Sequence, residues 1–169
     1  MRRVVKDTLY MDIAEKEPVG NTEKLILFVC TGNTCRSPMA AALYNHLFSR
    51  SDTFAFSRGI AADASPISKN AETVLMERGV LPTAKSDYRR HISRTVSEED
   101  IDRAELVVGI SSSHAMSLML RYPQYASKIA VMPEDVPDPF GGDLECYRQC
   151  LNMIEKGLLS GFGEKTDEK

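Results

Sequence analysis

The stretch "CTGNTCRSP", residues 30–38, places a thiol, Cys30, six residues before an arginine, Arg36. Backbone N–H groups in a tight turn that enters a helix point at one spot and favour an anion there. An arginine adds a planar charged fork that can bind two phosphate oxygens at once. Such positive surroundings also stabilise a cysteine as its nucleophilic thiolate. We therefore expect a phosphate pocket above Cys30, whose thiolate can attack phosphorus and form a phosphocysteine.

The residues around this pair fit an anion-binding loop. Gly32 permits a positive φ or a close approach of the backbone, while Asn33 tolerates left-handed geometry or braces the loop through its amide. Ser37 can donate a hydrogen bond to the thiol that leaves in the second step. The predicted phosphate- and substrate-binding residues of this stretch are Thr31, Gly32, Asn33, Thr34, Cys35 and Ser37.

The elements on either side of the loop must position these residues. A cysteine and an arginine six apart also occur by chance, as the end of a buried strand and a surface charge. Here the apolar run "LILFVC" predicts a strand covered on both faces, at residues 25–30. Met39, Leu43 and Leu47 recur every four residues, which predicts a helix from Pro38 to about Arg50. A strand–loop–helix unit favours the anion site over the chance pairing.

The rest of the chain continues the alternation of strands and helices. Apolar runs predict strands near 53–59, 105–110 and 128–133, and periodic segments with capping residues predict helices near 68–79, 97–104, 111–123 and 144–159. This order is typical of an α/β fold with a parallel sheet and helices on both faces. Right-handed crossovers then bring the loops that follow the strands to one edge of the sheet, where such folds bind ligands.

A carboxylate at that edge would complete the chemistry. Thiolate attack expels a leaving group that needs a proton, and hydrolysis of the phosphocysteine needs a base, so one carboxylate can serve both steps in turn. Asp138, in "VPDPFGG", follows the last predicted strand and emerges at the same edge as Cys30. An Asp-Pro pair also forms plain turns, so these residues alone leave both interpretations open.

Composition sets limits on the classes of function. The chain has 169 residues and a formal net charge of −3, which gives no global basic field for nucleic acid or an anionic membrane. It contains no apolar run of membrane-spanning length and no secretory signal pattern, so we expect a cytoplasmic protein whose four cysteines are not disulfide-bonded. We expect a single domain over residues 25–162, preceded by an extension or linker (1–24) and followed by a polar tail (163–169).

The loop "VCTGNTCRSPMA" resembles the C-x5-R-S phosphate loop of the low-molecular-weight protein tyrosine phosphatase family. Segments such as "SRGI", "HISRTVSEEDIDRAELVVGI" and "DPFGG" resemble family segments in the same order, and the resemblance spans about residues 25–158. It implies a flavodoxin-like, four-stranded parallel sheet flanked by helices (the phosphotyrosine phosphatase I fold) and cofactor-free, metal-independent catalysis. Cys30 would be the nucleophile, Arg36 the phosphate ligand and Asp138 the general acid, acting on a phosphorylated protein.

Two positions bear on the substrate. Tyrosine phosphatases of the family usually carry a bulky aliphatic residue before the second loop cysteine and Tyr or Trp after the Asp-Pro. This chain has Thr34 and Phe140, which resembles the bacterial protein arginine phosphatase branch. Thr34 would leave room for a guanidinium, Asp138 would pair with it and Phe140 would wall the groove. The alternatives are a tyrosine phosphatase, with Thr34 neutral for specificity, and a non-catalytic phosphate-binding module.

The other thiols permit a redox interpretation. Cys35 could trap an oxidised Cys30 as a disulfide, or it could simply be a small buried loop residue. Cys146 and Cys150, one helical turn apart, raise the alternative of an arsenate reductase on the same fold, although packing in the core is favoured for both.

The remaining polar residues give weaker signals. The three histidines, His46, His91 and His114, have no metal-ligand spacing, so no metal site is predicted. The basic residues Lys85, Arg89 and Arg90 could attract an acidic partner but are better explained as a solvated loop face, and the oligomeric state is not predicted.

Overall fold

The computed structural model describes residues 23–163, so the predicted extension and tail lie almost entirely outside the described residues. Four strands form one parallel sheet in the order β2-β1-β3-β4, which confirms the predicted fold class. The strands are β1 (Lys24–Cys30), β2 (Thr53–Gly59), β3 (Leu106–Gly109) and β4 (Ile129–Val131). Because all four run in the same direction, their carboxyl ends meet at one edge, where Cys30 pairs in register with Gly59.

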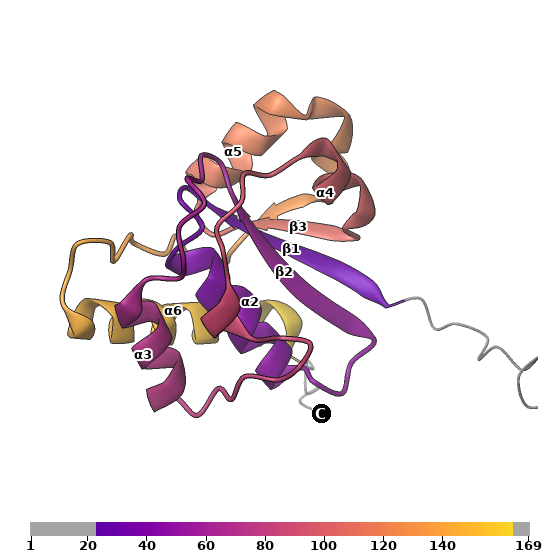
Figure 1. Ribbon diagram of the computed structural model, residues 1–169. Helices are drawn as coiled ribbons and strands as arrows, with labels where there is room; N and C mark the ends of the chain where they lie inside the picture. The colour runs from indigo at the N-terminus through magenta and orange to yellow at the C-terminus, as the bar shows by residue number, and fades with distance from the viewer. Residues whose placement is uncertain (1–22, 164–169) are drawn as a thin grey trace, which may run out of the picture.

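Helices cover both faces of the sheet (Figure 1). The lower face in that view packs against α2 (Arg36–Leu47), α3 (Lys69–Glu77) and α6 (Leu144–Phe162), and the upper face against α4 (Glu98–Arg103) and α5 (Ser112–Arg121). Two short 3-10 helices, Tyr88–Arg90 and Pro123–Lys128, complete the connections. Among the described residues, no helix is both long and apolar enough to cross a membrane.

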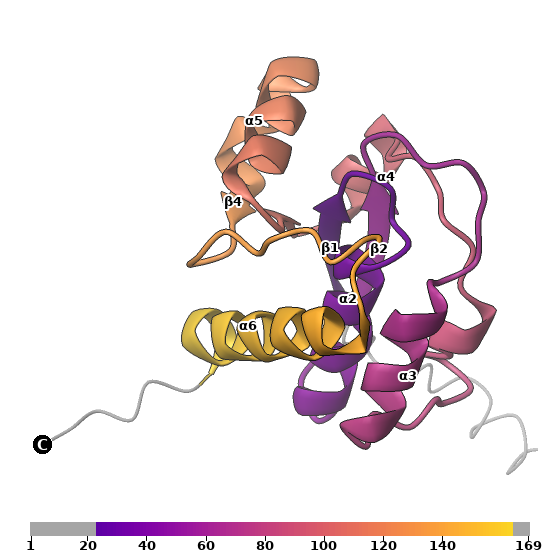
Figure 2. The same ribbon diagram turned by 90° about the vertical axis from the view of Figure 1, so that its left-hand side faces the viewer.

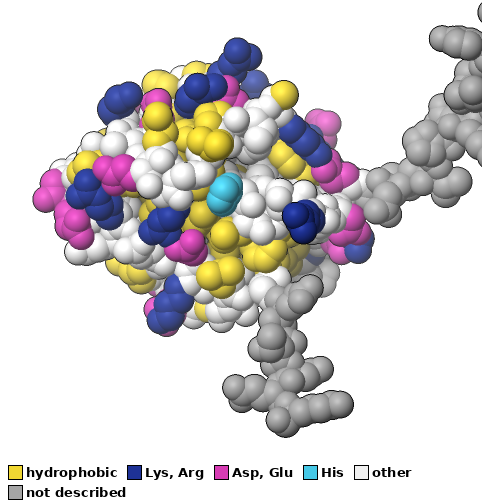
Figure 3. Space-filling view, turned by 90° about the horizontal axis from the view of Figure 1, so that it is seen from below, with side chains coloured by type: hydrophobic (Ala, Val, Ile, Leu, Met, Phe, Trp, Pro, Cys, Tyr) yellow, Lys and Arg dark blue, Asp and Glu magenta, His cyan; other side chains and the backbone are white. Residues whose placement is uncertain are grey.

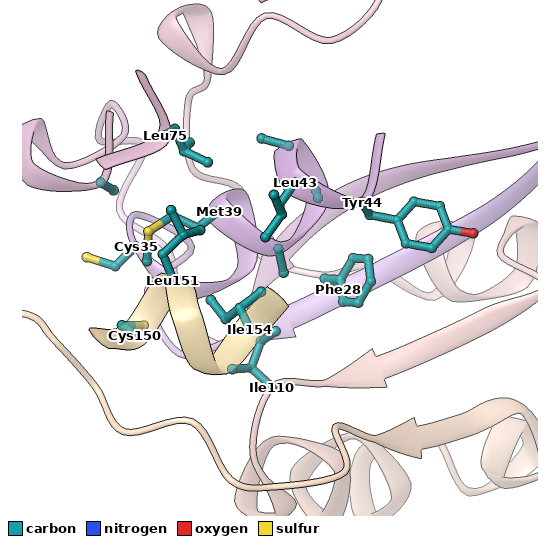
Figure 4. Close-up of a cluster of buried hydrophobic side chains, with 14 of the residues drawn as sticks. Phe28, Cys35, Met39, Leu43, Tyr44, Leu75, Ile110, Cys150, Leu151 and Ile154 are labelled. Atoms are coloured by element: carbon teal, nitrogen blue, oxygen red, sulfur yellow. The ribbon is translucent and has the colours of Figure 1, made fainter. Parts of the chain in front are cut away.

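The alternation of β1 explains why its run is apolar throughout. Ile26 and Phe28 belong to the core between the sheet and α2, α3 and α6, part of which Figure 4 shows, whereas Leu27 and Val29 belong to the core beneath α4 and α5. All four side chains are at most 5% exposed. A central strand that buries both faces holds its last residue, Cys30, in a fixed position.

Helix ends differ from the prediction at two places. Helix α2 begins at Arg36 and ends at Leu47, instead of running from Pro38 to about Arg50. Helix α6 continues past Leu159 to Phe162, because the Phe162 ring packs edge-on against Phe28 and Tyr44, with ring centroids 6.3 and 5.1 Å apart.

The surface carries no single-sign field on the face shown in Figure 3, where basic and acidic side chains lie interspersed among polar and hydrophobic ones. The basic residues of the 85–90 segment are paired: Arg89 with Asp87 at 2.9 Å, and Lys85 with Glu23. This arrangement agrees with a solvated loop face.

Candidate active site

An open cleft of about 520 Å³ lies at the carboxyl edge of the sheet. It contains every predicted site residue except Ser37, and it adds residues of the segment after β2. Three segments form it: the phosphate loop (residues 30–37), the rim loop (residues 61–68) and the acid segment (residues 135–140). The lining residues are Cys30, Thr31, Gly32, Asn33, Thr34, Cys35, Arg36, Ala61, Asp63, Ser65, Pro66, Ile67, Ser68, Asp138 and Phe140.

Asn33 holds the phosphate loop in shape. Its φ is 58°, the left-handed conformation that asparagine tolerates, and its side chain is fully buried. The amide Nδ2 donates to Ser37 Oγ (2.9 Å) and Ser57 Oγ (3.0 Å), while Oδ1 accepts from the Arg94 N–H (3.0 Å). Asn33 therefore fulfils both parts of the prediction made for it.

A glycine beside the phosphate loop is required at a position that was not predicted. Gly32 does not have a positive φ, and a Cβ built on it would meet only Thr34 Oγ1 at 3.8 Å. The positive φ suggested for Gly32 is therefore not observed, and a close approach of its backbone to a bound phosphate stays a prediction. Asn33 makes the left-handed turn instead. A close approach occurs at Gly59, where a Cβ would lie 2.6 Å from the Thr31 carbonyl oxygen. Gly59 thus lets the end of β2 support the loop, which sequence reasoning missed.

Ser37 lies behind Cys30 and offers two proton arrangements. Its Oγ is 3.0 Å from Cys30 Sγ, accepts from Asn33 Nδ2 and lies 3.2 Å from the Arg58 carbonyl oxygen. A serine has one proton to donate. With a neutral thiol, Cys30 donates to Ser37 and Ser37 donates to the carbonyl; with a thiolate, Ser37 turns its proton to the sulfur. The site can accommodate either state of the thiol, and in the thiolate state the Arg58 carbonyl gives up its hydrogen bond from Ser37.

Arg36 joins the phosphate loop to the acid segment. Its guanidinium is buried at the cleft floor, where Nη1 donates to the Val136 carbonyl at 3.1 Å and Nη2 lies 3.3 Å from Asp138 Oδ2. The Asp138 side chain is 53% exposed, and its Oδ1 accepts from the Phe140 N–H at 3.1 Å. Asp138 and Cys30 therefore face one cleft although 108 residues separate them (138 − 30).

Two histidines that sequence reasoning did not assign support the loop. His91 Nε2 donates to the Asn33 carbonyl at 2.7 Å, and burial, opposed in part by this bond and aided by Arg58 and Arg94, lowers the pKa of its imidazole. His114 Nε2 lies 3.0 Å from Thr31 Oγ1. His46 is exposed. The pattern around each histidine gave no periodic or spacing signal, because their partners lie 58 and 83 residues away.

The cysteines are all free thiols. Cys35 is buried, with its sulfur 3.3 Å from Tyr147 Oη; burial first, and this contact second, raise the pKa of Tyr147 to about 12. Cys150 is buried as predicted, and burial raises the pKa of its thiol to about 12. The packing prediction is wrong for Cys146, which is exposed in the first turn of α6, beside Gly142.

Arg58 forms an ion pair with Asp100 at 2.9 Å. Burial alone would raise the pKa of the Asp100 carboxyl, but hydrogen bonds from Arg58 and Ser97 outweigh burial and lower it. Within residues 23–163, no group of three or more His, Cys, Asp or Glu side chains is arranged to hold a metal ion.

Comparison with known proteins gives a consistent picture. A family model described as low molecular weight phosphotyrosine protein phosphatase matches residues 25–168. The protein-arginine-phosphatase of Geobacillus stearothermophilus is 35% identical over 147 residues, which cover 83% of this chain and 94% of that protein. The crystal structure of a low molecular weight protein tyrosine phosphatase from T. tengcongensis is also 35% identical, with a TM-score of 0.73 over 80% of this chain and 95% of that one.

A third similar structure bears on the covalent chemistry. It is YwlE arginine phosphatase in a cysteine-to-serine mutant form with a phosphorylated active-site serine, similar to this chain with a TM-score of 0.72. The two sequences are 28% identical, and the match covers 82% of this chain and 97% of that one. In that protein, a phosphoryl group is attached to the residue that replaces a cysteine.

Proposed function

Because the chain belongs to the low molecular weight phosphotyrosine protein phosphatase family, we propose that it hydrolyses phosphoarginine on proteins through a phosphocysteine intermediate. The observation that carries this proposal is one cleft in which Cys30, Arg36 and Asp138 converge around a loop containing Thr34. Arg36 with the loop N–H groups binds the phosphoryl group, and no cofactor takes part.

In the first step, the Cys30 thiolate attacks phosphorus and the bond from phosphorus to the substrate nitrogen breaks. The electron pair of that bond stays on the nitrogen, which takes a proton from the Asp138 carboxyl. The loop amides and Arg36 stabilise the negative charge on the phosphoryl oxygens in the transition state. These groups are held before the substrate binds, since Asn33 and Arg36 are both anchored by hydrogen bonds.

In the second step, the Asp138 carboxylate takes a proton from water, which attacks the phosphocysteine and releases inorganic phosphate. Cys30 leaves as a thiolate. Ser37 Oγ, 3.0 Å from Cys30 Sγ, donates its hydrogen bond to this developing charge, and its second acceptor, the Arg58 carbonyl, is released. The pairing of Ser37 with Cys30 thus assists both thiolate attack and thiolate departure.

The charges of the cleft favour a cationic leaving group. Arg36 is its single basic lining residue among the described residues, and its guanidinium is buried at the floor where a phosphate binds. Two acidic side chains, Asp63 and Asp138, line the walls above it, and Asp138 becomes a carboxylate once it has protonated the leaving nitrogen. Hydrogen bonding from Ser65 lowers the pKa of Asp63, which keeps that carboxylate charged. Opposite charges at this depth complement the guanidinium next to the phosphoryl group of phosphoarginine.

Thr34 and Phe140 shape the remaining walls. Thr34 lines the cleft with a small, hydroxyl-bearing side chain, and its carbonyl accepts from the Ser68 N–H at 2.8 Å, which ties the loop to the start of α3. Phe140 is 74% exposed, so its ring is free to stack on a planar guanidinium. A threonine in place of a bulky aliphatic residue leaves room for the in-plane nitrogens of that group.

The test compares the turnover of matched phosphoarginine and phosphotyrosine peptides by the wild type and by Thr34→Ile. We expect the wild type to prefer phosphoarginine, and Thr34→Ile to shift the ratio of kcat/KM values towards phosphotyrosine by about tenfold or more. Thr73→Ile, on the exposed side of α3 and outside the cleft, is the matched control and should leave the ratio unchanged. A wild type that prefers phosphotyrosine would refute the arginine specificity and leave the runner-up, a protein tyrosine phosphatase.

A further inference from the structure

His114 is a buried titratable group that the proposed mechanism does not use. It lies in the first turn of α5 with 5% of its surface exposed. Its Nδ1 lies 3.1 Å from the backbone nitrogen of Ser111, which can only donate. Nδ1 must therefore be the unprotonated acceptor, and the proton of the neutral ring is on Nε2.

This tautomer fixes the hydrogen bond at the other side of the ring. Nε2 lies 3.0 Å from Thr31 Oγ1, so the imidazole donates and the threonine oxygen accepts. The Thr31 hydroxyl proton is then not used by His114 and must point elsewhere. Thr31 is exposed and lines the cleft beside Cys30 and Arg36, so a donor at this position faces the phosphate site.

We propose that His114 is a positioning residue that directs the Thr31 hydroxyl proton into the cleft, as a side-chain donor to the phosphoryl oxygens of the substrate. The proposal rests on the phosphatase function proposed above. It adds a donor beyond the loop amides and Arg36, supplied by the residue that directly follows the nucleophile.

The main chain of Thr31 is held firmly enough for this orientation to matter. Its carbonyl accepts from the Ala61 N–H at 3.0 Å, and the carbonyl of Cys30 accepts from the Ile60 N–H at 2.8 Å. A Cβ on Gly59 would come within 2.6 Å of the Thr31 carbonyl oxygen, so the two segments are in close contact. The Thr31 main chain is thus held by the segment after β2, and the Thr31 side chain is held by His114.

The same turn of α5 also anchors the acid segment. Ser111 Oγ donates to the Val136 carbonyl at 3.2 Å, the carbonyl that Arg36 also contacts, and Ser112 donates from N and Oγ to the Asp135 carboxylate at 2.8 and 2.7 Å. Figure 2 shows the segment that leaves β4 passing between α5 and α6 beside the end of β1. The turn that holds Thr31 therefore holds the segment of Asp138 as well, and both residues line the same cleft.

The surroundings of His114 keep its imidazole neutral, as the proposed hydrogen bond from Nε2–H requires. Burial first, and the positive charge of Arg36 second, lower the pKa of His114 to about 4, against the opposing influence of Asp138 and Asp135. The ring is therefore neutral throughout the neutral pH range, and the Nε2–H bond to Thr31 persists there.

The test uses the full chain and inorganic phosphate as the probe. We expect Thr31→Val, which removes the hydroxyl at nearly constant shape, to weaken phosphate binding and to lower kcat/KM by about tenfold each. The melting temperature should also fall, because the buried His114 Nε2–H loses its acceptor. Thr31→Ser, which keeps a hydroxyl, should restore most of the phosphate affinity and of kcat/KM. His114→Asn retains an oxygen that can accept from Ser111 N–H but cannot reach Thr31, so it should lower phosphate affinity by a factor similar to that of Thr31→Val.

The double variant decides whether His114 acts through Thr31. We expect Thr31→Val with His114→Asn to bind phosphate no more weakly than Thr31→Val alone. Multiplied losses would show that His114 acts elsewhere, and unchanged phosphate affinity in Thr31→Val would show that the hydroxyl is not a donor to the anion. If His114→Asn does not fold, the comparison of Thr31→Val with Thr31→Ser still decides the second point. Phosphate binding is measured without turnover, so a failure here is distinct from a wild type that hydrolyses neither phosphopeptide, which would refute the proposed function.

Discussion

The phosphate loop and the rim loop each contain one non-glycine residue in the left-handed backbone region, and the two are held in opposite ways. Asn33, at φ 58°, is fully buried, and three hydrogen bonds hold its side chain. Ala64, at φ 62°, is exposed and has no polar side-chain atom. The strain of the first is offset by bonds that only asparagine makes, whereas the strain of the second is carried by the neighbouring backbone.

The difference indicates how the cleft divides its tasks. The phosphate loop is part of the core, because its residues bond to β2, to the segment before α4 and to α6. The two ends of the rim loop, Ala61 and Ser68, donate to the phosphate loop. Between these ends it is held from one side, where Ser65 and Ser93 exchange hydrogen bonds and Ala62 N–H donates to Thr95 Oγ1. A rigid floor suits a group common to all phosphoryl substrates, and an open wall suits the part of the substrate that varies.

The largest effect on kcat should come from replacing Asp138. Its side chain is half exposed, so this result would show that an exposed residue of the cleft can be essential for activity. We expect Asp138→Asn to lower kcat by about 10² to 10⁴-fold, because the amide can neither protonate the leaving group nor activate water. The free energy of unfolding should change by less than about 1 kcal/mol, since the side chain is half exposed and its ion pair with Arg36 is weakly stabilising. Glu134→Gln, at an exposed carboxylate just before this segment and outside the cleft lining, is the control for kcat. A fully active Asp138→Asn would exclude Asp138 as the general acid.

The next effect is on the free energy of unfolding and concerns Asn33 in the phosphate loop. Asn33→Ala should lower the free energy of unfolding by about 3 to 4 kcal/mol, because three buried hydrogen bonds are lost and alanine is strained at φ 58°. Asn33→Gly removes the same bonds without the strain, so it should recover about 1 kcal/mol of that loss. Urea unfolding of both variants and of Asn70→Ala, a half-buried control on α3, measures these differences. Equal stabilities for the Ala and Gly variants would show that the left-handed conformation is not strained.

A third effect is the pH dependence of the free energy of unfolding, which should differ between substitutions at the histidines beside the phosphate loop and substitutions in the rim loop. The folded state holds His114 with its pKa lowered to about 4, against about 6.5 in the unfolded chain, so the unfolded chain binds more protons between these values. The contribution of neutral His114 to the free energy of unfolding is therefore fully present above pH 6.5. It falls by about 3 kcal/mol as the pH decreases towards 4. His91, whose pKa burial also lowers, acts in the same direction.

Unfolding free energies of the wild type and His114→Asn between pH 7 and pH 4 measure this slope. The variant should have a shallower slope, while His46→Gln, at an exposed position, should match the wild type. The rim contains no histidine, so substitutions there should leave the slope as it is. An unchanged slope in His114→Asn would contradict a buried neutral His114.

The sequence predicted the residues of the phosphate loop better than those of the rim loop, for a physical reason. Cys30, Arg36 and Ser37 are neighbours along the chain, and one apolar strand and one periodic helix suffice to bring them together. Topology placed Asp138 at the same edge, since parallel strands end together, but only the family resemblance distinguished it from a plain Asp-Pro turn. The contacts of Asn33 with Ser57 and Arg94, and of Thr31 with His114, join segments distant in the sequence, and no local pattern specifies them. The positive φ suggested for Gly32 is not observed, because a glycine permits a positive φ without requiring one.

The smallest effect tests the strain in the rim loop directly. Ala64→Gly removes the steric cost of a left-handed alanine, roughly 1 to 2 kcal/mol, but adds backbone entropy to the unfolded chain, about 0.5 to 1 kcal/mol. We therefore expect a net gain in the free energy of unfolding of about 0.5 kcal/mol, measured by urea unfolding, and a similar gain for Ala64→Asn. In contrast to Asn33, no substitution at this position should affect phosphate binding, because Ala64 lies next to Asp63 and Ser65 but does not line the cleft. The opposite result would be a destabilising Ala64→Gly together with a stabilising Ala64→Asn. It would show that the alanine contributes stiffness to the rim loop rather than strain, and the KM for phosphopeptides should then rise in the glycine variant alone.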